Sequence, residues 1–238
     1  LIDQLKKFVS GKNKTTISNA PQWNEILRES PTEDILKNIK INFNWLEILI
    51  NLIFITFFKI FFKIFYLLRT EGRHNLAQQG PYLICPNHTT YLDGLIIASS
   101  LPYKMIMNTY FVGHSDFFES PILRPFIKIG RLVPIEINYN LTEAFKACSY
   151  VLRHSKILCF FPEGQRSING ELNEFKKGIG ILIKELNLSI VPVYIEGAFE
   201  IWPRGQKFPH LGPIKVKYGA IIDPKALGSG FSIEENPE

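Results

Sequence analysis

Short apolar runs alternate with helix-like patterns along most of the chain from Pro81 onward. Buried strands are predicted where apolar residues run together, over 82–86, 103–108, 131–137, 156–162 and 189–195. Helices are predicted where apolar residues recur every three or four positions, over 93–101, 117–129, 141–154 and 178–187. A last strand is expected within 213–222, at an edge of the sheet. This alternation predicts an α/β fold with a mostly parallel central sheet flanked by helices.

The segment 44–69 is strongly apolar and predicts a long helix. At about 100° per residue, its polar residues gather on one side and leave a wide apolar face opposite. These polar residues are Asn44, Glu47, Asn51, Lys59, Lys63, Tyr66 and Arg69. Only residues 48–58 separate Glu47 from Lys59, whereas a membrane span needs about 20 apolar residues. The pattern therefore favours an amphipathic helix in the membrane interface. A transmembrane span and a helix buried against the domain's own core remain as alternatives.

The beginning of the chain differs in character from the rest. Residues 10–32 are rich in turn formers and predict a linker with one short helical insert. The early lysines are followed by polar sequence, which does not match a secretory signal peptide. A chain that starts with Leu1 is expected to be a piece of a longer protein or a processed product. The expected division is a linker over 1–32, a membrane-associating helical segment over 33–69 and the α/β domain over 70–238.

Composition narrows the classes of partner. The formal net charge of +5 and a pI near 9.0 suit an anionic partner such as nucleic acid, phospholipid headgroups or a phosphorylated substrate. Many phenylalanines lie on the helix-like segment 43–65 and are not interleaved with basic residues as on a nucleic-acid stacking sheet. Nucleic acid is therefore not expected. Cys85, Cys148 and Cys159 lack metal-ligand spacing and are expected to be core residues, so no metal site is predicted.

The stretch CPNHTTYLDG, residues 85–94, ends the first strand of the α/β region. Pro86 cannot donate a ladder hydrogen bond, so His88 is expected on a loop at the carboxyl end of that strand. Asp93 precedes an apolar helical run and is well placed to start the helix. An N-capping aspartate beside a hydrogen-bonded histidine explains these residues equally well.

A second polar stretch, FPEGQRS at 161–167, also follows an apolar strand. Arg166 offers a fork of donors that matches phosphate oxygens, and Gly164 allows a ligand to approach the backbone closely. Glu163 can fix that arginine or accept a hydrogen bond from a substrate hydroxyl. An ordinary polar turn with a local ion pair is the alternative, but two such stretches at carboxyl ends of strands favour a ligand site.

These motifs together resemble those of the glycerolipid acyltransferase family, the bacterial PlsC-type enzymes. N-H-x-x-x-x-D at 87–93, F-P-E-G-x-R-S at 161–167 and V-P-V at 191–193 occur in the family's order, and the resemblance covers about 70–222. It implies that His88 is the general base and that Asp93 orients it. It also implies that the loop after 161 holds the acceptor's phosphate, mainly through an arginine. The substrate-binding residues implied by the motifs are Asn87, Glu163, Gly164, Arg166 and Ser167.

One family motif departs from its usual form. The family's second block normally has a glycine followed, after a few apolar residues, by a phosphate-binding arginine, but here GRLVPIE at 130–136 has Glu136 in that position. Arg131, directly after the glycine, is a candidate replacement. This departure puts a bare phosphate monoester acceptor in doubt. In FKKGIG at 175–180, Lys176 and Lys177 are candidates for contacts with the donor's phosphates, with a solvated helix face as the equal alternative.

The resemblance implies a membrane-associated O-acyltransferase without metal or organic cofactor. A fatty acyl chain would pass from acyl-CoA or an acyl-carrier protein to the hydroxyl of a lysophospholipid or glycerol-phosphate-type acceptor. No Ser or Cys nucleophile lies in the motifs, so direct transfer is expected. The expected location is the cytoplasmic face of the cell membrane, peripheral or monotopic. A catalytically inactive lipid-binding membrane module and a thioester hydrolase are the alternatives. Similarity to ligase–carrier–acyltransferase fusions also suggests that residues 1–9 end a carrier domain.

Overall fold

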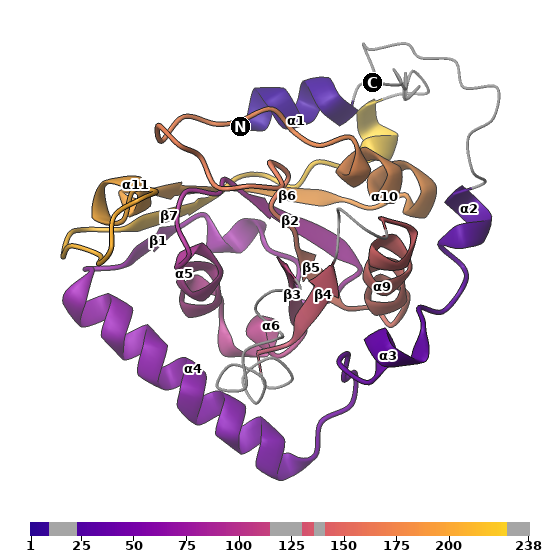
Figure 1. Cartoon of the computed structure of the whole chain (residues 1–238), viewed down its shortest axis with the longest axis horizontal. Coiled ribbons are helices and arrows are strands. Elements are labelled where there is room, and N and C mark those ends of the chain that lie inside the picture. Colours follow the sequence, from indigo (N-terminus) through magenta and orange to yellow (C-terminus); the bar gives the residue numbers. More distant parts are fainter. Residues whose placement is uncertain (10–22, 115–129, 136–140, 228–238) are drawn as a thin grey trace.

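The computed structural model describes residues 1–9, 23–114, 130–135 and 141–227, and these form a three-layer α/β fold around one sheet (Figure 1). The sheet has seven strands in the order β1-β7-β6-β2-β5-β3-β4. The strands are β1 (Arg69–Glu71), β2 (Tyr82–Pro86), β3 (Thr109–His114), β4 (Leu132–Ile135), β5 (Ile157–Cys159), β6 (Ile190–Glu196) and β7 (Lys215–Tyr218). All neighbouring pairs are parallel except β6 and β7. The expectation of a mostly parallel sheet flanked by helices is confirmed.

Helices cover both faces of this sheet. They are α1 (Ile2–Val9), α2 (Trp23–Ile26), α3 (Glu33–Leu36), α4 (Trp45–Phe65), α5 (Asp93–Ser100), α6 (Tyr103–Ile106), α9 (Leu141–Arg153), α10 (Gly178–Leu186) and α11 (Ala198–Ile201), with short 3₁₀ helices at Arg73–Asn75 and Pro224–Leu227. Strand β2 shows how the two layers form. Leu83 and Cys85 pack into the cluster beneath α9 and α10, whereas Tyr82 and Ile84 pack toward α4 and α5.

Two strand predictions were wrong. Residues 103–108 form α6 and a turn, and the strand starts only at Thr109. Pro102 precedes the helix in an extended conformation, and Met105 and Ile106 are buried by helical periodicity instead of strand alternation. Strand β7 was expected at an edge of the sheet, but the three-residue strand β1 pairs along its outer side and is the edge strand. The predicted helix over 117–129 lies outside the described residues.

The described parts of the N-terminal segment, residues 1–9 and 23–32, pack onto the α/β core. Leu5 and Leu27 are fully or almost fully buried in the cluster that contains α9 and α10. The backbone carbonyl of Leu27 accepts a hydrogen bond from the Ser149 hydroxyl, and the backbone N–H of Thr32 donates to Glu143 at 2.8 Å. The described parts of 1–32 therefore pack on the same core as α9 and α10.

Helix α4 is bound to the domain through its polar side. Asn44 and Glu47 form a capping box at its start, and Asn51, Ile55 and Phe62 are the buried side chains of the helix. The Lys59 ammonium donates to the carbonyl oxygens of Ser99 and Leu101, which end α5. Asn51 and Lys59 lie on the side of the helix that faces the protein, as the pattern predicts, whereas Lys63 is exposed and Arg69 lies in β1, beyond the end of the helix.

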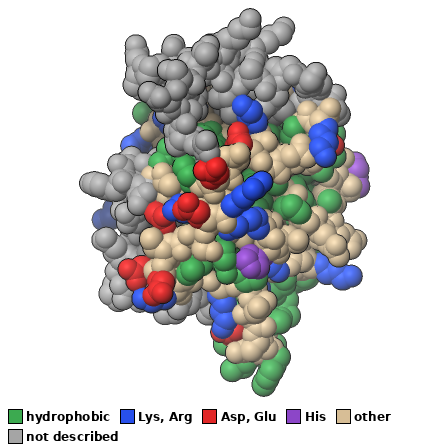
Figure 2. All heavy atoms as spheres, turned by 90° about the vertical axis from the view of Figure 1, so that its right-hand side faces the viewer, with side chains coloured by type: hydrophobic (Ala, Val, Ile, Leu, Met, Phe, Trp, Pro, Cys, Tyr) green, Lys and Arg blue, Asp and Glu red, His purple; other side chains and the backbone are tan. Residues whose placement is uncertain are grey.

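The opposite side of α4 leaves large apolar side chains in the open. These are Trp45, Leu46, Ile48, Leu49, Ile50, Ile53, Phe57, Ile60, Ile64 and Phe65. The helix is the one candidate span among the described residues by length and hydropathy, and only 17% of its most apolar window is buried. The lower end of the molecule, where α4 begins in Figure 1, is a projection of hydrophobic side chains in Figure 2. A core helix would bury this face, so the alternative of a helix buried in the domain is not supported.

Candidate active site

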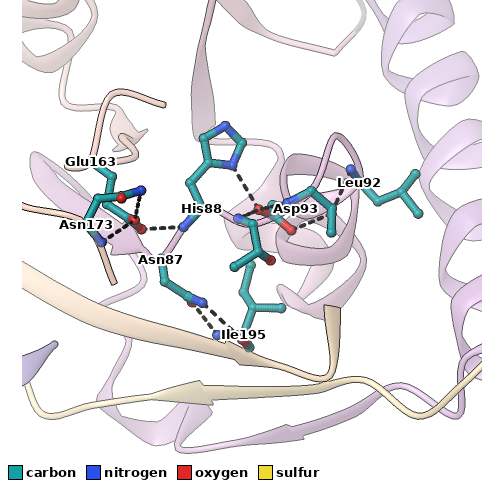
Figure 3. A network of polar contacts seen from close by, with 9 residues as sticks. Asn87, His88, Leu92, Asp93, Glu163, Asn173 and Ile195 are labelled. Carbon is teal, nitrogen blue, oxygen red and sulfur yellow. Dashed lines mark hydrogen bonds and ion pairs between the residues drawn. The ribbon is translucent and has the colours of Figure 1, made fainter. Parts of the chain in front are cut away.

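The site is built where β2 ends, and Asn87 fixes the chain as it leaves the sheet. The Asn87 side chain accepts a hydrogen bond from the backbone N–H of Ile195 at 2.7 Å and donates to the carbonyl oxygen of the same residue at 3.1 Å. Only 4% of Asn87 is exposed. Asn87 was expected to bind substrate, but its amide is bonded to β6 inside the protein. It ties the β2 loop to the neighbouring strand and places the next residue, His88, above the sheet edge (Figure 3).

Asp93 is the first residue of α5 and is fully buried. Its Oδ2 accepts hydrogen bonds from the backbone N–H groups of Thr89 at 2.6 Å and Thr90 at 2.9 Å, and contacts His88 Nδ1 at 2.8 Å. Its Oδ1 accepts a hydrogen bond from the Thr90 hydroxyl at 2.6 Å. Because these donors surround both oxygens, the carboxylate has a fixed orientation toward the imidazole. Asp93 is thus the first residue of the helix and not its N-cap, which is Leu92, and its carboxylate pairs with His88.

His88 has one ring nitrogen bound and one directed outward. With Nδ1 against Asp93, the neutral tautomer favoured by the carboxylate carries its proton on Nδ1 and leaves Nε2 as the basic atom. Figure 3 shows this second nitrogen pointing away from Asp93. The ring stacks on Phe161 with centroids 4.2 Å apart, and 23% of the histidine side chain is exposed. This geometry suits removal of a proton from a hydroxyl that arrives from solvent or from a surface.

The loop after β5 holds the His88 backbone from both sides. Glu163 Oε1 accepts a hydrogen bond from the His88 N–H at 2.6 Å, and the Ser167 N–H donates to the His88 carbonyl at 2.7 Å. Glu163 Oε2 accepts from the backbone N–H and the side-chain amide of Asn173 at 2.8 and 2.9 Å. Burial raises the pKa of the Glu163 carboxyl, and its hydrogen bonds to Asn173 and His88 oppose that shift.

Glu163 and Ser167 were expected to contact substrate, and the structure places both inside the protein. They are 1% and 0% exposed, and the Ser167 hydroxyl donates to the Asn169 side chain at 3.2 Å. Glu163 also forms its described bonds with His88 and Asn173 and not with Arg166. The expected local ion pair is therefore replaced by a carboxylate that joins two loops.

Three of the expected binding residues, Gly164, Arg166 and Lys176, lie on the solvent-facing side of this loop, which we call its open side. Gly164 is exposed with φ +67°, and a Cβ built there would lie 2.9 Å from the Lys176 side chain, so the glycine makes room for that lysine. Lys176 is itself exposed. The Arg166 guanidinium lies 3.5 Å from the ring centre of Tyr91, which belongs to the His88 loop. Arginine, lysine and His88 thus converge on one side of the carboxyl ends of β2 and β5.

Arg131 does not reach this site. It immediately precedes β4 and therefore lies at the amino ends of the parallel strands, opposite the edge that carries His88. Its guanidinium stacks over Phe43 at 4.1 Å and contacts the Met107 sulfur at 3.3 Å, and 4% of the residue is exposed. The candidate replacement for the missing family arginine is thus a buried structural residue. Glu136 lies outside the described residues.

The three cysteines lie in the core, as expected from the sequence. Cys85, Cys148 and Cys159 are buried, and burial raises the pKa of all three thiols, that of Cys148 to about 12. A buried thiol of this kind is a poor nucleophile. Within the described ranges, no group of three or more His, Cys, Asp or Glu side chains is arranged to hold a metal ion.

Some parts of the site were not identified from the sequence. Asn173, Phe161, Thr90 and Tyr91 each contact a catalytic or binding candidate. Thr90 and Tyr91 lie between His88 and Asp93 in the sequence, and this position is the signal that marks them as part of the site. Asn173 lies ten residues after Glu163 in a polar loop, and no local sequence signal marks it.

The comparisons with known proteins agree with the fold and the motifs. The Acyltransferase family model matches residues 68–196, so the chain belongs to the acyltransferase family. It is 27% identical over 145 residues to the chloroplastic 1-acyl-sn-glycerol-3-phosphate acyltransferase of Arabidopsis thaliana, covering 60% of this chain and 39% of that protein.

Two other relatives extend this picture. The chain is 29% identical over 141 residues to the 1-acyl-sn-glycerol-3-phosphate acyltransferase of Cocos nucifera, covering 58% of this chain and 44% of the relative. The crystal structure of PlsC, the 1-acyl-sn-glycerophosphate acyltransferase of Thermotoga maritima, has the same fold with a TM-score of 0.60 and 24% identity, covering 76% and 71% of the two chains. The chain spans less than half the length of the two plant relatives named here.

Proposed function

We propose that the chain is an O-acyltransferase that moves a fatty acyl group from a thioester to the hydroxyl of a lysophosphatidate-type acceptor at a membrane surface. The observation that carries this proposal is the His88–Asp93 pair with Nε2 open, beside the phosphate-compatible side chain of Arg166. The names of the relatives, all 1-acyl-sn-glycerol-3-phosphate acyltransferases, support the acceptor class.

The proposed reaction is a direct transfer. His88 Nε2 takes the proton of the acceptor hydroxyl while that oxygen attacks the thioester carbonyl carbon. The carbon–sulfur bond then breaks, and the thiolate leaves with the proton returned from the imidazolium. Asp93 holds the imidazole and stabilises its charged form without becoming protonated. General-base help of this kind contributes about 10²–10⁴ in rate.

Acceptor recognition is assigned to the open side of the loop. Arg166 is held by the ring of Tyr91 and is not paired with Glu163, so its donors are directed to an anionic group. Lys176 lies against Gly164 and adds a second positive charge. Arg131 does not lie at this edge of the sheet. We therefore assign Arg166 and Lys176, among the described residues, to the phosphate groups of acceptor and donor.

The membrane is the proposed location. The exposed apolar face of α4, with lysines near its polar side, matches a helix that lies in one leaflet, and we place the domain on the cytoplasmic face. The 21 residues of α4 also satisfy the length of a span, but the polar contacts of Lys59 and Asn51 with the domain favour a helix lying along the surface.

A donor-by-acceptor panel tests the function. Acyl-CoA and an acyl-carrier protein are each supplied with lysophosphatidate, glycerol 3-phosphate, lysophosphatidylcholine or no acceptor, and thiol release and esterified product are measured. The proposal predicts thiol release that requires lysophosphatidate. Equal thiol release without any acceptor would identify a thioester hydrolase, and vesicle binding without turnover of any thioester would identify an inactive lipid-binding module.

A further inference from the structure

The connection between α11 and β7, residues 202–213, holds large apolar side chains in the open. We call it the 202–213 loop. Phe208 is 68% exposed and Leu211 is 71% exposed, whereas the neighbouring Ile201 and Ile214 are buried. Two such side chains on one short loop form an apolar projection. They can be removed from water only if another surface covers them.

The loop is held in this shape by its own hydrogen bonds. The His210 N–H donates to the Ile201 carbonyl at 2.8 Å, which closes the loop, and the Trp202 indole N–H donates to the Gln206 carbonyl at 2.9 Å. Gly205 adopts φ +94° at the turn between them. Phe208 and Leu211 are therefore presented outward by an ordered backbone and are not the side chains of an open strand end.

The loop continues the apolar face of α4. The Ile214 N–H donates to the carbonyl of Tyr66 at 2.9 Å, and the Arg69 N–H donates to the carbonyl of Ile214 at 3.0 Å. These bonds place the end of the loop beside the C-terminal end of α4, where Ile64 and Leu67 are 62% and 57% exposed. Figure 1 shows this connection, in gold, next to that end of the helix.

The charge of the loop fits an anionic surface. Arg204, Lys207 and His210 are exposed, and the loop sequence contains no Asp or Glu. The Lys207 ammonium lies 5.5 Å from the ring centre of Phe208. Basic residues beside protruding aromatic and aliphatic side chains are the arrangement expected where a protein enters the headgroup region of anionic phospholipids.

The loop also adjoins the candidate active site. Its first residue, Trp202, packs on Tyr91 with ring centres 5.7 Å apart, and Tyr91 carries the Arg166 guanidinium. Phe199 of α11 lies where a Cβ on Gly170, in the loop after Ser167, would be 2.7 Å from its ring. A surface that contacts both α4 and the 202–213 loop therefore passes beside the open side of His88.

From these contacts we infer that the 202–213 loop is a second membrane-binding element, which docks on bilayers that contain anionic phospholipid. Together with α4 it gives the chain two separated contacts and thus one orientation on the bilayer. The inference rests on the proposed function in that this orientation brings the site to a lipid acceptor. An acidic carrier protein would also suit the charge, but the continuity with the apolar face of α4 favours a bilayer.

Vesicle binding by the full chain tests this element. With phosphatidylcholine vesicles containing phosphatidylglycerol, the double variant Phe208→Ser/Leu211→Ser is expected to bind about tenfold more weakly or worse. The double variant Arg204→Glu/Lys207→Glu is expected to lose the gain in affinity that phosphatidylglycerol gives, and to bind pure phosphatidylcholine vesicles like the unmodified chain. Leu141→Ser, with 41% exposure, and Lys184→Glu on α10 are matched controls on the opposite flank.

A labelled thiol keeps the test decisive if a serine variant fails to fold. The three native cysteines are buried, so a solvatochromic maleimide will react with an introduced Phe208→Cys. Its emission is expected to shift to the blue on addition of anionic vesicles, whereas the dye on Leu141→Cys is expected to stay unchanged.

Two results would overturn the inference: equal emission changes at both positions, or a shift that an acidic carrier protein causes and vesicles do not. The proposed function is tested separately by acyl transfer from the unmodified chain to a water-soluble short-chain lysophosphatidate without vesicles. Failure of that transfer removes the function and leaves the dye result to decide the loop.

Discussion

Replacing Glu163 by glutamine should disturb catalysis through the His88 backbone. The carboxylate accepts one hydrogen bond from His88 and two from Asn173, all within 2.9 Å, and the residue is 1% exposed. In Glu163→Gln an NH₂ group must replace one of the two oxygens. Whichever oxygen is lost, a buried N–H donor then faces another donor.

The magnitude follows from the bonds that are lost. A hydrogen bond to a charged group contributes about 1.5–3 kcal/mol, and a buried donor left without an acceptor costs about 1–3 kcal/mol. Glu163→Gln should therefore destabilise the fold by about 2–5 kcal/mol in urea unfolding. Asn173→Ala removes only the side-chain donor and should cost about 1 kcal/mol, which makes it the graded control.

The activity assay separates a positioning role from substrate contact. A displacement of the general base by about 1 Å can lower the rate about 10²-fold. We therefore expect Glu163→Gln to lower kcat about tenfold to 10²-fold at a nearly unchanged KM for the acceptor. The reverse result, an increased acceptor KM at an unchanged kcat and unchanged stability, would refute the positioning role and return Glu163 to the substrate.

Three further predictions concern the neighbouring groups. Asp93→Asn places an amide among four donors and should lower kcat about 10²–10⁴-fold in the thiol-release assay; a kcat within a factor of about two of the unmodified chain would contradict the pairing with His88. Arg131→Met should leave the acceptor KM unchanged, because the guanidinium lies at the amino ends of the strands; a clear rise in KM would return Arg131 to the site. Because the pKa of Glu163 is raised, proton binding adds to stability below the unfolded pKa near 4.5, and this proton-linked part alone is lost as pH rises through the folded pKa. The difference in unfolding free energy between the unmodified chain and Glu163→Gln should therefore become more favourable to the unmodified chain on acidification across this window, and a difference that moves the other way would contradict the direction.

Much of the fold was predictable because the buried strands are continuous apolar runs. Strand β2 occupies 82–86 as expected, and β6 and α10 differ from their expected bounds by about one residue. The strand prediction over 103–108 was wrong because MIM is a short continuous apolar run, as in a buried strand, whereas Pro102 and the packing of Met105 select a helix. Strand β1 has only three residues and no apolar run, and its pairing with β7 depends on tertiary contacts that no local pattern shows.

The contact between His88 and Asp93 was predictable from the sequence, and the environment of the proposed binding residues was less so. His88 lies on the short loop that leads to Asp93, so their close spacing in the sequence already suggested that the two side chains contact each other. Sequence position could not show that Asn87, Glu163 and Ser167 point inward, because burial is set by β6 and by the distant Asn173. Motif residues that are far from one another in the chain can stabilise the loops just as well as they can bind a ligand.

The sequence also could not show which face of α4 packs on the domain. The sequence identified the two faces of the helix, but not that its polar face is the one packed on α5. That orientation follows from the carbonyl oxygens at the end of α5, which need a donor and receive Lys59. The apolar face is left outward as a consequence.

Acceptor-dependent thiol release by His88→Ala tests whether His88 is the general base. The assay supplies acyl-CoA with and without lysophosphatidate, and circular dichroism confirms that the variant is folded. We expect acceptor-dependent turnover to fall about 10²–10⁴-fold if Nε2 is the base that removes the hydroxyl proton. A folded His88→Ala chain with turnover close to that of the unmodified chain would contradict this role of His88.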